Sequence, residues 1–158
     1  MNAVNFSELF DLSLVFYDLE VKSKEEFLEK VSIELETKKY VKNSYKDAIK
    51  ARELKYPTGL QTEIIKVAIP HTDPEHVNKS VISIARLNKP VQFNEMGNHD
   101  QTVDVELVFT LALNDGKNHL GVIQRLIGLF SNGEVMKKLK KSDNKEDLLN
   151  VILESMYI

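Results

Sequence analysis

Between residues 103 and 113, apolar side chains occupy every second position of the chain. The alternating set is Val103, Val105, Leu107, Phe109, Leu111 and Leu113. A period of two fits a strand and not a helix, so this stretch predicts a β-strand with one fully apolar face. The opposite face is polar at Asp104 and Glu106 and apolar from Val108 onward, which is typical of a strand that enters a covered sheet.

Shorter apolar runs predict the other strands of this sheet. They lie at 14–17, 67–69, 80–86 and 91–93. Pro70 ends the run at 67–69, because proline has no N–H to donate to a strand ladder.

Helical spacing of apolar residues accounts for most of the remaining chain. The predicted helices are one behind the capping box Ser23-x-x-Glu26, one over about 44–54, one over 120–130, a short basic one after Gly133, and one opened by Asp143-x-x-Glu146. Pro57 disfavours helical geometry at Tyr56, so the second helix should end in a turn there. Because strands and helices are mixed, we expect a single α/β domain over residues 1–158, with a central mixed sheet and helices packed on both sides.

Composition removes several classes of function. The 158 residues are 42% hydrophobic and carry a net charge of −3 with no long basic stretch, which argues against a dedicated nucleic-acid binder. The chain has no cysteine, which excludes disulfides, thiolate metal sites and a cysteine nucleophile. No apolar run approaches the ~20 residues needed to span a membrane. Residues 1–10 hold no Lys or Arg, unlike a secretory signal, so we expect a cytoplasmic protein.

Among the four histidines, His71 has the most unusual position. It follows Pro70 at the end of the predicted strand 67–69. Ligands of α/β sheets gather at strand ends, and a proline stiffens the backbone that carries the ring. An imidazole with the ordinary pKa of ~6.5 is neutral and nucleophilic near pH 7. By position alone, His71 is equally well explained as a functional residue and as a turn histidine.

The other histidines carry weaker signals. His119 falls just before or within the first turn of a predicted helix, where free N–H groups suit an anion, although spacing alone favours simple packing. His76 and His99 lie in polar runs and should be exposed. The spacing of His71, Asp73 and His76 matches no standard zinc site, and HExxH is absent, so no metal is expected.

Two further motifs have ordinary structural explanations. Asp115-Gly116-Lys117 lacks the upstream glycine of a P-loop, and no GxSxG nucleophile elbow occurs. The cluster Lys137, Lys138, Lys140 and Lys141 has no interleaved aromatic residues, so we expect a solvated helix face.

An ordered set of motifs resembles a known family. The segment 67–71, Val-Ala-Ile-Pro-His, resembles the phosphorylation-site motif of the fructose/mannitol-type enzyme IIA domains of the bacterial sugar phosphotransferase system. Upstream, 51–60 reads Ala-Arg-Glu-Leu-Lys-Tyr-Pro-Thr-Gly-Leu, similar to the family's R-E-x-x-F/Y-P-T-G. Downstream, Val91-Gln-Phe93, Met96-Gly97, the strand 103–113 and His119-Leu120 follow in the family's order. The resemblance spans about 13–149 and is most similar to the galactitol-type members.

The resemblance implies a phosphocarrier. His71 would accept a phosphoryl group from the phosphorylated histidine carrier protein HPr and pass it to a IIB component during sugar uptake. His119 would stabilise the phosphoryl group, and Arg52 would clamp its oxygens, although a surface arginine paired with an acidic neighbour is the alternative. Thr58 would either offer a hydroxyl to the phosphate or only shape the turn. No cofactor, metal or nucleic acid is implied, and the membrane is involved only through a IIC transporter.

The chain departs from the family pattern in places, and other functions stay open. Thr72 stands where many members have glycine after the active histidine, and Glu63 and Ile64 stand where small or apolar residues are usual. A regulatory IIA-like sensor would use the same histidine to change binding to a partner protein. An interaction module with an inactive site and an unrelated metal hydrolase are the remaining alternatives.

Overall fold

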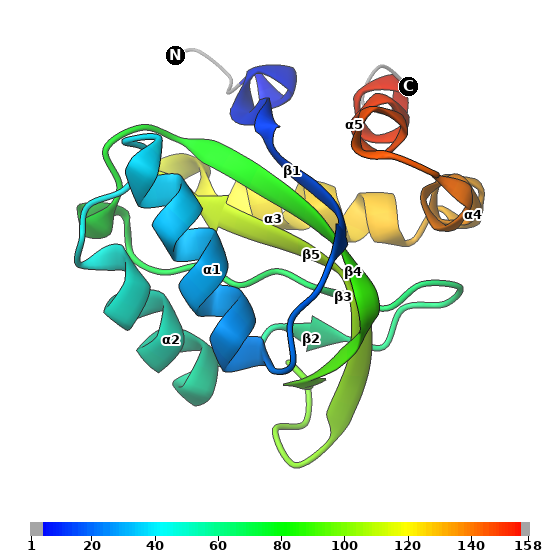
Figure 1. Ribbon diagram of the computed structural model, residues 1–158, viewed down its shortest axis with the longest axis horizontal. Helices are drawn as coiled ribbons and strands as arrows, with labels where there is room; N and C mark the ends of the chain where they lie inside the picture. The colour runs from blue at the N-terminus through cyan, green and yellow to red at the C-terminus, as the bar shows by residue number, and fades with distance from the viewer. Residues whose placement is uncertain (1–4, 156–158) are drawn as a thin grey trace.

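A five-stranded mixed sheet forms the middle layer of the computed structural model, which describes residues 5–155 (Figure 1). The strands are β1 (Phe10–Leu19), β2 (Gly59–Leu60), β3 (Val67–Ala68), β4 (Val81–Asn94) and β5 (Thr102–Ala112). Their order is β1-β4-β5-β3-β2. The pairs β1–β4 and β3–β5 are parallel, whereas β4–β5 and β2–β3 are antiparallel. Residues 1–4, part of the N-terminal segment considered for a signal, lie outside the described residues.

Helices cover both faces of this sheet, which confirms the predicted α/β architecture. They are α1 (Lys24–Thr37), α2 (Tyr45–Lys55), α3 (Gly116–Phe130), α4 (Gly133–Lys141) and α5 (Lys145–Ser155), with short 3₁₀ turns η1 (Phe6–Leu9) and η2 (Pro74–His76). Figure 1 shows α1 and α2 in front of the sheet and α3 behind it. In the described part of the chain, none of the helices has both the length and the apolar character needed to cross a bilayer.

Each face of the sheet buries its own apolar core. On the first face, α1 and α2 contribute Phe27, Leu35, Tyr45 and Ile49, which pack with Leu14, Ala85 and Val108 of the strands. On the second face, α3, α4 and α5 contribute Leu126, Phe130, Met136, Leu148 and Ile152, which pack with Ile82, Ile84 and Phe109. Because the sheet is covered on both sides, its central strands are apolar on both sides.

The side chains of β5 change faces partway along the strand. Val105 packs in the core with α1 and α2, whereas Leu107 packs in the core with α3, α4 and α5. The N–H groups of Glu106 and Leu107 both donate to the carbonyl of Lys66, at 3.0 and 3.2 Å, which marks a β-bulge. The predicted strand is therefore confirmed, but the prediction of one fully apolar face is wrong, because the bulge resets the alternation.

The two strands predicted at 80–86 and 91–93 are one continuous strand, β4. Its ladder with β5 is interrupted between Arg86 and Val91. Pro90 lies inside this interruption. The strands form no ladder hydrogen bond there, so the missing N–H of proline has no cost. The proline thus marks an irregularity within one strand and not a boundary between two.

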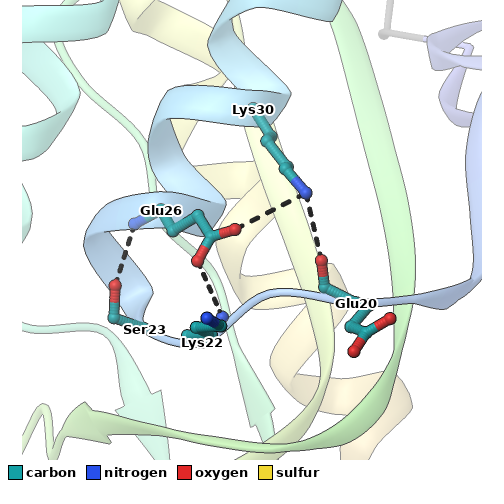
Figure 2. Close-up of polar contacts among 5 residues, drawn as sticks. All are labelled: Glu20, Lys22, Ser23, Glu26 and Lys30. Carbon is teal, nitrogen blue, oxygen red and sulfur yellow. Dashed lines mark hydrogen bonds and ion pairs between the residues drawn. The ribbon is translucent and has the colours of Figure 1, made fainter.

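The start of α1 shows a variant of the predicted capping box (Figure 2). The Ser23 hydroxyl accepts the N–H of Glu26 at 3.1 Å, as predicted. The Glu26 carboxylate accepts the N–H of Lys22 at 2.9 Å, one residue before the expected Ser23. Lys30 pairs with Glu26 at 3.5 Å and donates to the Glu20 carbonyl at 3.1 Å, which ties the helix to the loop that follows β1.

The end of α2 and the start of α5 can be compared with the helix boundaries predicted from the sequence. Tyr56, before Pro57, has φ −130° and ψ 82° and ends α2 as predicted. The last helix is capped one residue later than predicted, because the Asn144 side chain, and not Asp143, accepts the N–H of Asp147 at 2.8 Å.

We expect Gly59→Ala to destabilise the fold by about 1–3 kcal/mol, because overpacking against backbone forces a local shift. A Cβ at this position would lie 2.6 Å from the carbonyl oxygen of Asn94. Gly121→Ala is the matched control, since nothing lies within 4 Å of its added Cβ and alanine favours the helix. Urea unfolding of both variants checks this, and unchanged stability of Gly59→Ala would contradict it.

Candidate active site

The His71 side chain is held at the end of β3 by the backbone next to it. The N–H of Leu111 in β5 donates to the Pro70 carbonyl at 2.9 Å and continues the parallel ladder to His71. The ring nitrogen Nδ1 lies 2.8 Å from the carbonyl oxygen of Ile69. A carbonyl only accepts, so Nδ1 carries the hydrogen and Nε2 keeps a free lone pair. The half-buried ring is therefore oriented as a nucleophile through Nε2.

A second imidazole faces this ring from the start of α3. Asp115 caps the helix by accepting the N–H of Lys117 at 2.9 Å, and His119 lies in the first turn. The ring centroids of His71 and His119 are 4.9 Å apart with an interplanar angle of 67°. Nε2 of His119 is buried and has no hydrogen-bond partner within the described residues.

Arg52 reaches the same place from the last turn of α2. Its Nη1 lies 3.6 Å from a carboxylate oxygen of Asp73, two residues after His71. Its guanidinium carbon lies 4.6 Å from the centre of the Tyr56 ring. Nε of Arg52 is buried without a hydrogen-bond partner in the described part of the chain. The structure thus gathers three of the four predicted site residues, His71, His119 and Arg52, from three separate segments.

The electrostatic environment keeps both imidazoles neutral near pH 7. Burial lowers the pKa of His71, and the Arg52 cation acts in the same direction, while the bond to Ile69 and the charge of Asp73 oppose them. Burial also lowers the pKa of His119, helped by His71 and then by Arg52. A neutral His71 keeps the lone pair that a nucleophile needs.

Thr58, the fourth predicted site residue, uses its polar groups elsewhere. It is buried, and its hydroxyl donates to Oε1 of Glu53 at 2.7 Å while its N–H donates to Oε2 at 2.8 Å. Burial raises the pKa of Glu53 to about 7, although the two bonds from Thr58 act against this rise. Sequence reasoning missed Glu53. Tyr45, Ile49 and Glu53 follow one another at intervals of four residues on the buried face of α2. This spacing is the signal that could have identified Glu53.

The remaining histidines lie outside this cluster. His99 is exposed, as predicted. His76 is half-buried, so the prediction of an exposed side chain is wrong, because the loop after His71 folds back and places its Nδ1 2.8 Å from the Ser44 hydroxyl. Within residues 5–155, no group of three or more His, Cys, Asp or Glu side chains is arranged to hold a metal ion.

Comparison with known proteins places this site in a family. Residues 8–155 match the family model described as "Phosphoenolpyruvate-dependent sugar phosphotransferase system, EIIA 2". The chain therefore belongs to this family and is an EIIA component of a sugar phosphotransferase system. This confirms the resemblance found in the sequence.

Individual relatives agree with this assignment. The galactitol-specific EIIA component of Escherichia coli K12 is 28% identical over 133 residues, which are 82% of this chain and 88% of that protein. The nitrogen regulatory protein IIA-Ntr from Neisseria meningitidis superposes with a TM-score of 0.74 at 26% identity, covering 92% of this chain and 97% of that one. The complex of mannitol enzyme IIA with phosphorylated enzyme IIB from Escherichia coli matches with a TM-score of 0.75 at 24% identity, covering 92% and 99%. The last likeness shows the fold.

The raised pKa of Glu53 predicts a specific dependence of folding on pH. The native state keeps this proton up to about pH 7, whereas the unfolded chain loses it near 4.5. Stability contributed by this group is therefore full below pH 4.5 and lost as pH rises to 7, by about 3 kcal/mol at 1.36 kcal/mol for each unit. Glu53→Gln should remove this decline. Urea unfolding of both proteins at pH 5 and pH 8 checks it, and parallel pH profiles would contradict it.

Proposed function

We propose that His71 is the phosphoryl carrier of this EIIA protein. It takes the group from phosphorylated HPr and gives it to a IIB component that phosphorylates the incoming sugar. The observation that carries this proposal is the 2.8 Å hydrogen bond from Nδ1 to the Ile69 carbonyl, which leaves Nε2 as the free nucleophile beside His119.

The transfer forms one bond and breaks one. The Nε2 lone pair of His71 attacks phosphorus, while the P–N bond to the HPr histidine breaks and its electron pair returns to that ring. The Nδ1 proton stays on His71, bound to the Ile69 carbonyl. The phosphorylated ring is therefore a cation and a good leaving group, and it can transfer the phosphoryl group to the IIB nucleophile.

Two buried donors support a place for the phosphoryl oxygens. Nε2 of His119 and Nε of Arg52 are both buried without partners in the described residues. An unpaired buried donor costs about 1–3 kcal/mol, and an anion between these groups recovers that energy. In the tautomer with hydrogen on Nε2, the neutral His119 donates to one oxygen. The Arg52 guanidinium supplies positive charge and a planar fork to others.

The surroundings of His71 suit partners that bind in turn. Two exposed apolar side chains lie beside the cluster, namely Tyr56, whose ring contacts the Arg52 guanidinium, and Leu120, which follows His119; they are 49% and 64% exposed. Such a surface fits short-lived contacts with HPr and then with IIB. The Escherichia coli mannitol complex pairs a protein of this fold with a phosphorylated IIB. We propose a cytoplasmic protein that meets the membrane only through a IIC transporter and needs no cofactor.

The relatives favour two roles. The galactitol-specific relative supports a sugar alcohol similar to galactitol as the transported substrate. The nitrogen regulatory relative supports the second candidate, a sensor whose phosphorylation changes binding to another protein. Transfer from phosphorylated His71 onto a galactitol-type IIB protein separates them, because a sensor would not pass the group on.

His71→Ala should abolish labelling by phosphorylated HPr. Intact-mass measurement should show one acid-labile phosphoryl group on the wild-type protein and none on the variant, because no other histidine ring within residues 5–155 has the same backbone-held Nδ1–H. His99→Ala, at an exposed histidine, is the control and should be labelled fully. Full labelling of His71→Ala would refute the proposed carrier.

His119→Ala should fold normally yet accept phosphoryl roughly 10–100 times more slowly, since it loses one donor that faces the developing charge. Quenched single-turnover labelling measures the rate, and circular dichroism checks the fold. The same assay on His99→Ala gives the baseline. A wild-type rate in His119→Ala would remove this residue from the site.

A further inference from the structure

A buried carboxylate lies beside the site and has no part in the transfer described above. Among residues 5–155, Glu53 is the only charged residue that is buried, with 2% exposure. It follows Arg52 directly, and successive helical side chains point about 100° apart, so the two face different directions. Glu53 turns toward Thr58, which donates to both of its carboxylate oxygens.

These two bonds close a short loop that contains Tyr56. At one end, the N–H of Tyr56 donates to the Arg52 carbonyl at 2.7 Å. At the other end, Thr58 is held at 2.7 and 2.8 Å by Glu53, and Pro57 between them restricts φ. The Tyr56 backbone is thus fixed on both sides, and its ring lies 4.6 Å from the Arg52 guanidinium.

We propose that Glu53 and Thr58 are positioning residues for phosphoryl transfer. Their double hydrogen bond holds Tyr56 as the platform for the Arg52 guanidinium and so aims Arg52 at the phosphoryl group on His71. This inference rests on the proposed function and explains why the arginine, glutamate, tyrosine, proline and threonine occur together in one motif.

Stability alone does not explain the carboxylate. Glu53 lies in the last turns of α2, where the helix dipole disfavours negative charge. Burial also disfavours the ionised form, which raises its pKa. An apolar side chain would avoid both costs, so the polar side chain is better explained by the two bonds it makes with Thr58.

A direct contact from Thr58 to phosphate is disfavoured by the same geometry. Thr58 is 3% exposed, and its hydroxyl proton points to Glu53 at 2.7 Å. Its N–H points to the other carboxylate oxygen. Both donors of this residue are therefore in use inside the protein, and its influence on His71 has to pass through Tyr56 and Arg52.

A double-mutant cycle tests this, with the single-turnover rate of labelling by the cognate phosphorylated HPr as readout. Thr58→Val and Glu53→Leu should each slow labelling roughly tenfold, because a small misplacement of a clamping group is costly. Thr58→Ser keeps both hydrogen bonds. Glu53→Gln keeps both contacts, because its amide oxygen accepts the Thr58 N–H and its NH2 group donates to the Thr58 hydroxyl oxygen. Both variants should stay within about twofold of wild type. In an Arg52→Ala background, Thr58→Val should cause no further slowing.

The opposite results would overturn the inference. Equal slowing by Thr58→Val with and without Arg52 would mean that Thr58 acts directly. Wild-type rates in Thr58→Val, which loses the hydroxyl bond and keeps the N–H bond, would mean that the hydroxyl bond does not position Arg52. All rates are measured below the unfolding transition of every variant, and Thr58→Val carries the test if Glu53→Leu does not fold. Absence of labelling in the unmutated protein would instead refute the proposed function, so the two failures are distinct.

Discussion

The proposed chemistry of this protein depends on one hydrogen bond, from Nδ1 of His71 to the carbonyl of Ile69. It decides which nitrogen keeps a lone pair, and it anchors the ring to the strand from which it emerges. The carbonyl is itself fixed, because Pro70 restricts the next φ and the Pro70 carbonyl is bound by the N–H of Leu111. The orientation of the nucleophile is therefore inherited from the sheet and does not depend on a flexible loop.

Sheet topology explains why His119 meets His71. β3 runs parallel to β5, so the carboxyl ends of both strands lie at the same edge. His71 leaves β3 at that edge, and α3 begins just after β5 ends, with His119 in its first turn. Two residues that are distant in sequence are thus brought together by one parallel pairing, in the manner of ligand sites at strand ends.

Sequence periodicity predicted the helices, the long strand and the two-sided covering of the sheet, because burial imposes those patterns. It could not predict the bulge at Glu106, since a strand that changes faces still reads as an alternating strand. The polar residues around His76 wrongly predicted an exposed side chain, because its half-buried position depends on a contact with the distant Ser44. The resemblance of the motif around Arg52 to the family implied a cationic clamp, but the partner of Thr58 became visible only when α2 and the following turn were in place.

Charge at the proposed site suits an anion that arrives from outside. Both imidazoles are shifted toward their neutral forms, partly because Arg52 lies near them. A phosphoryl dianion would act against this shift toward the neutral imidazoles. Its negative charge would stabilise the Arg52 cation and favour hydrogen-bond donation from His119. Asp73, which pairs with Arg52 at 3.6 Å, is mostly exposed and can yield the guanidinium to the stronger anion. In the proposed transfer, the same cation therefore keeps His71 nucleophilic before the step and stabilises the product after it.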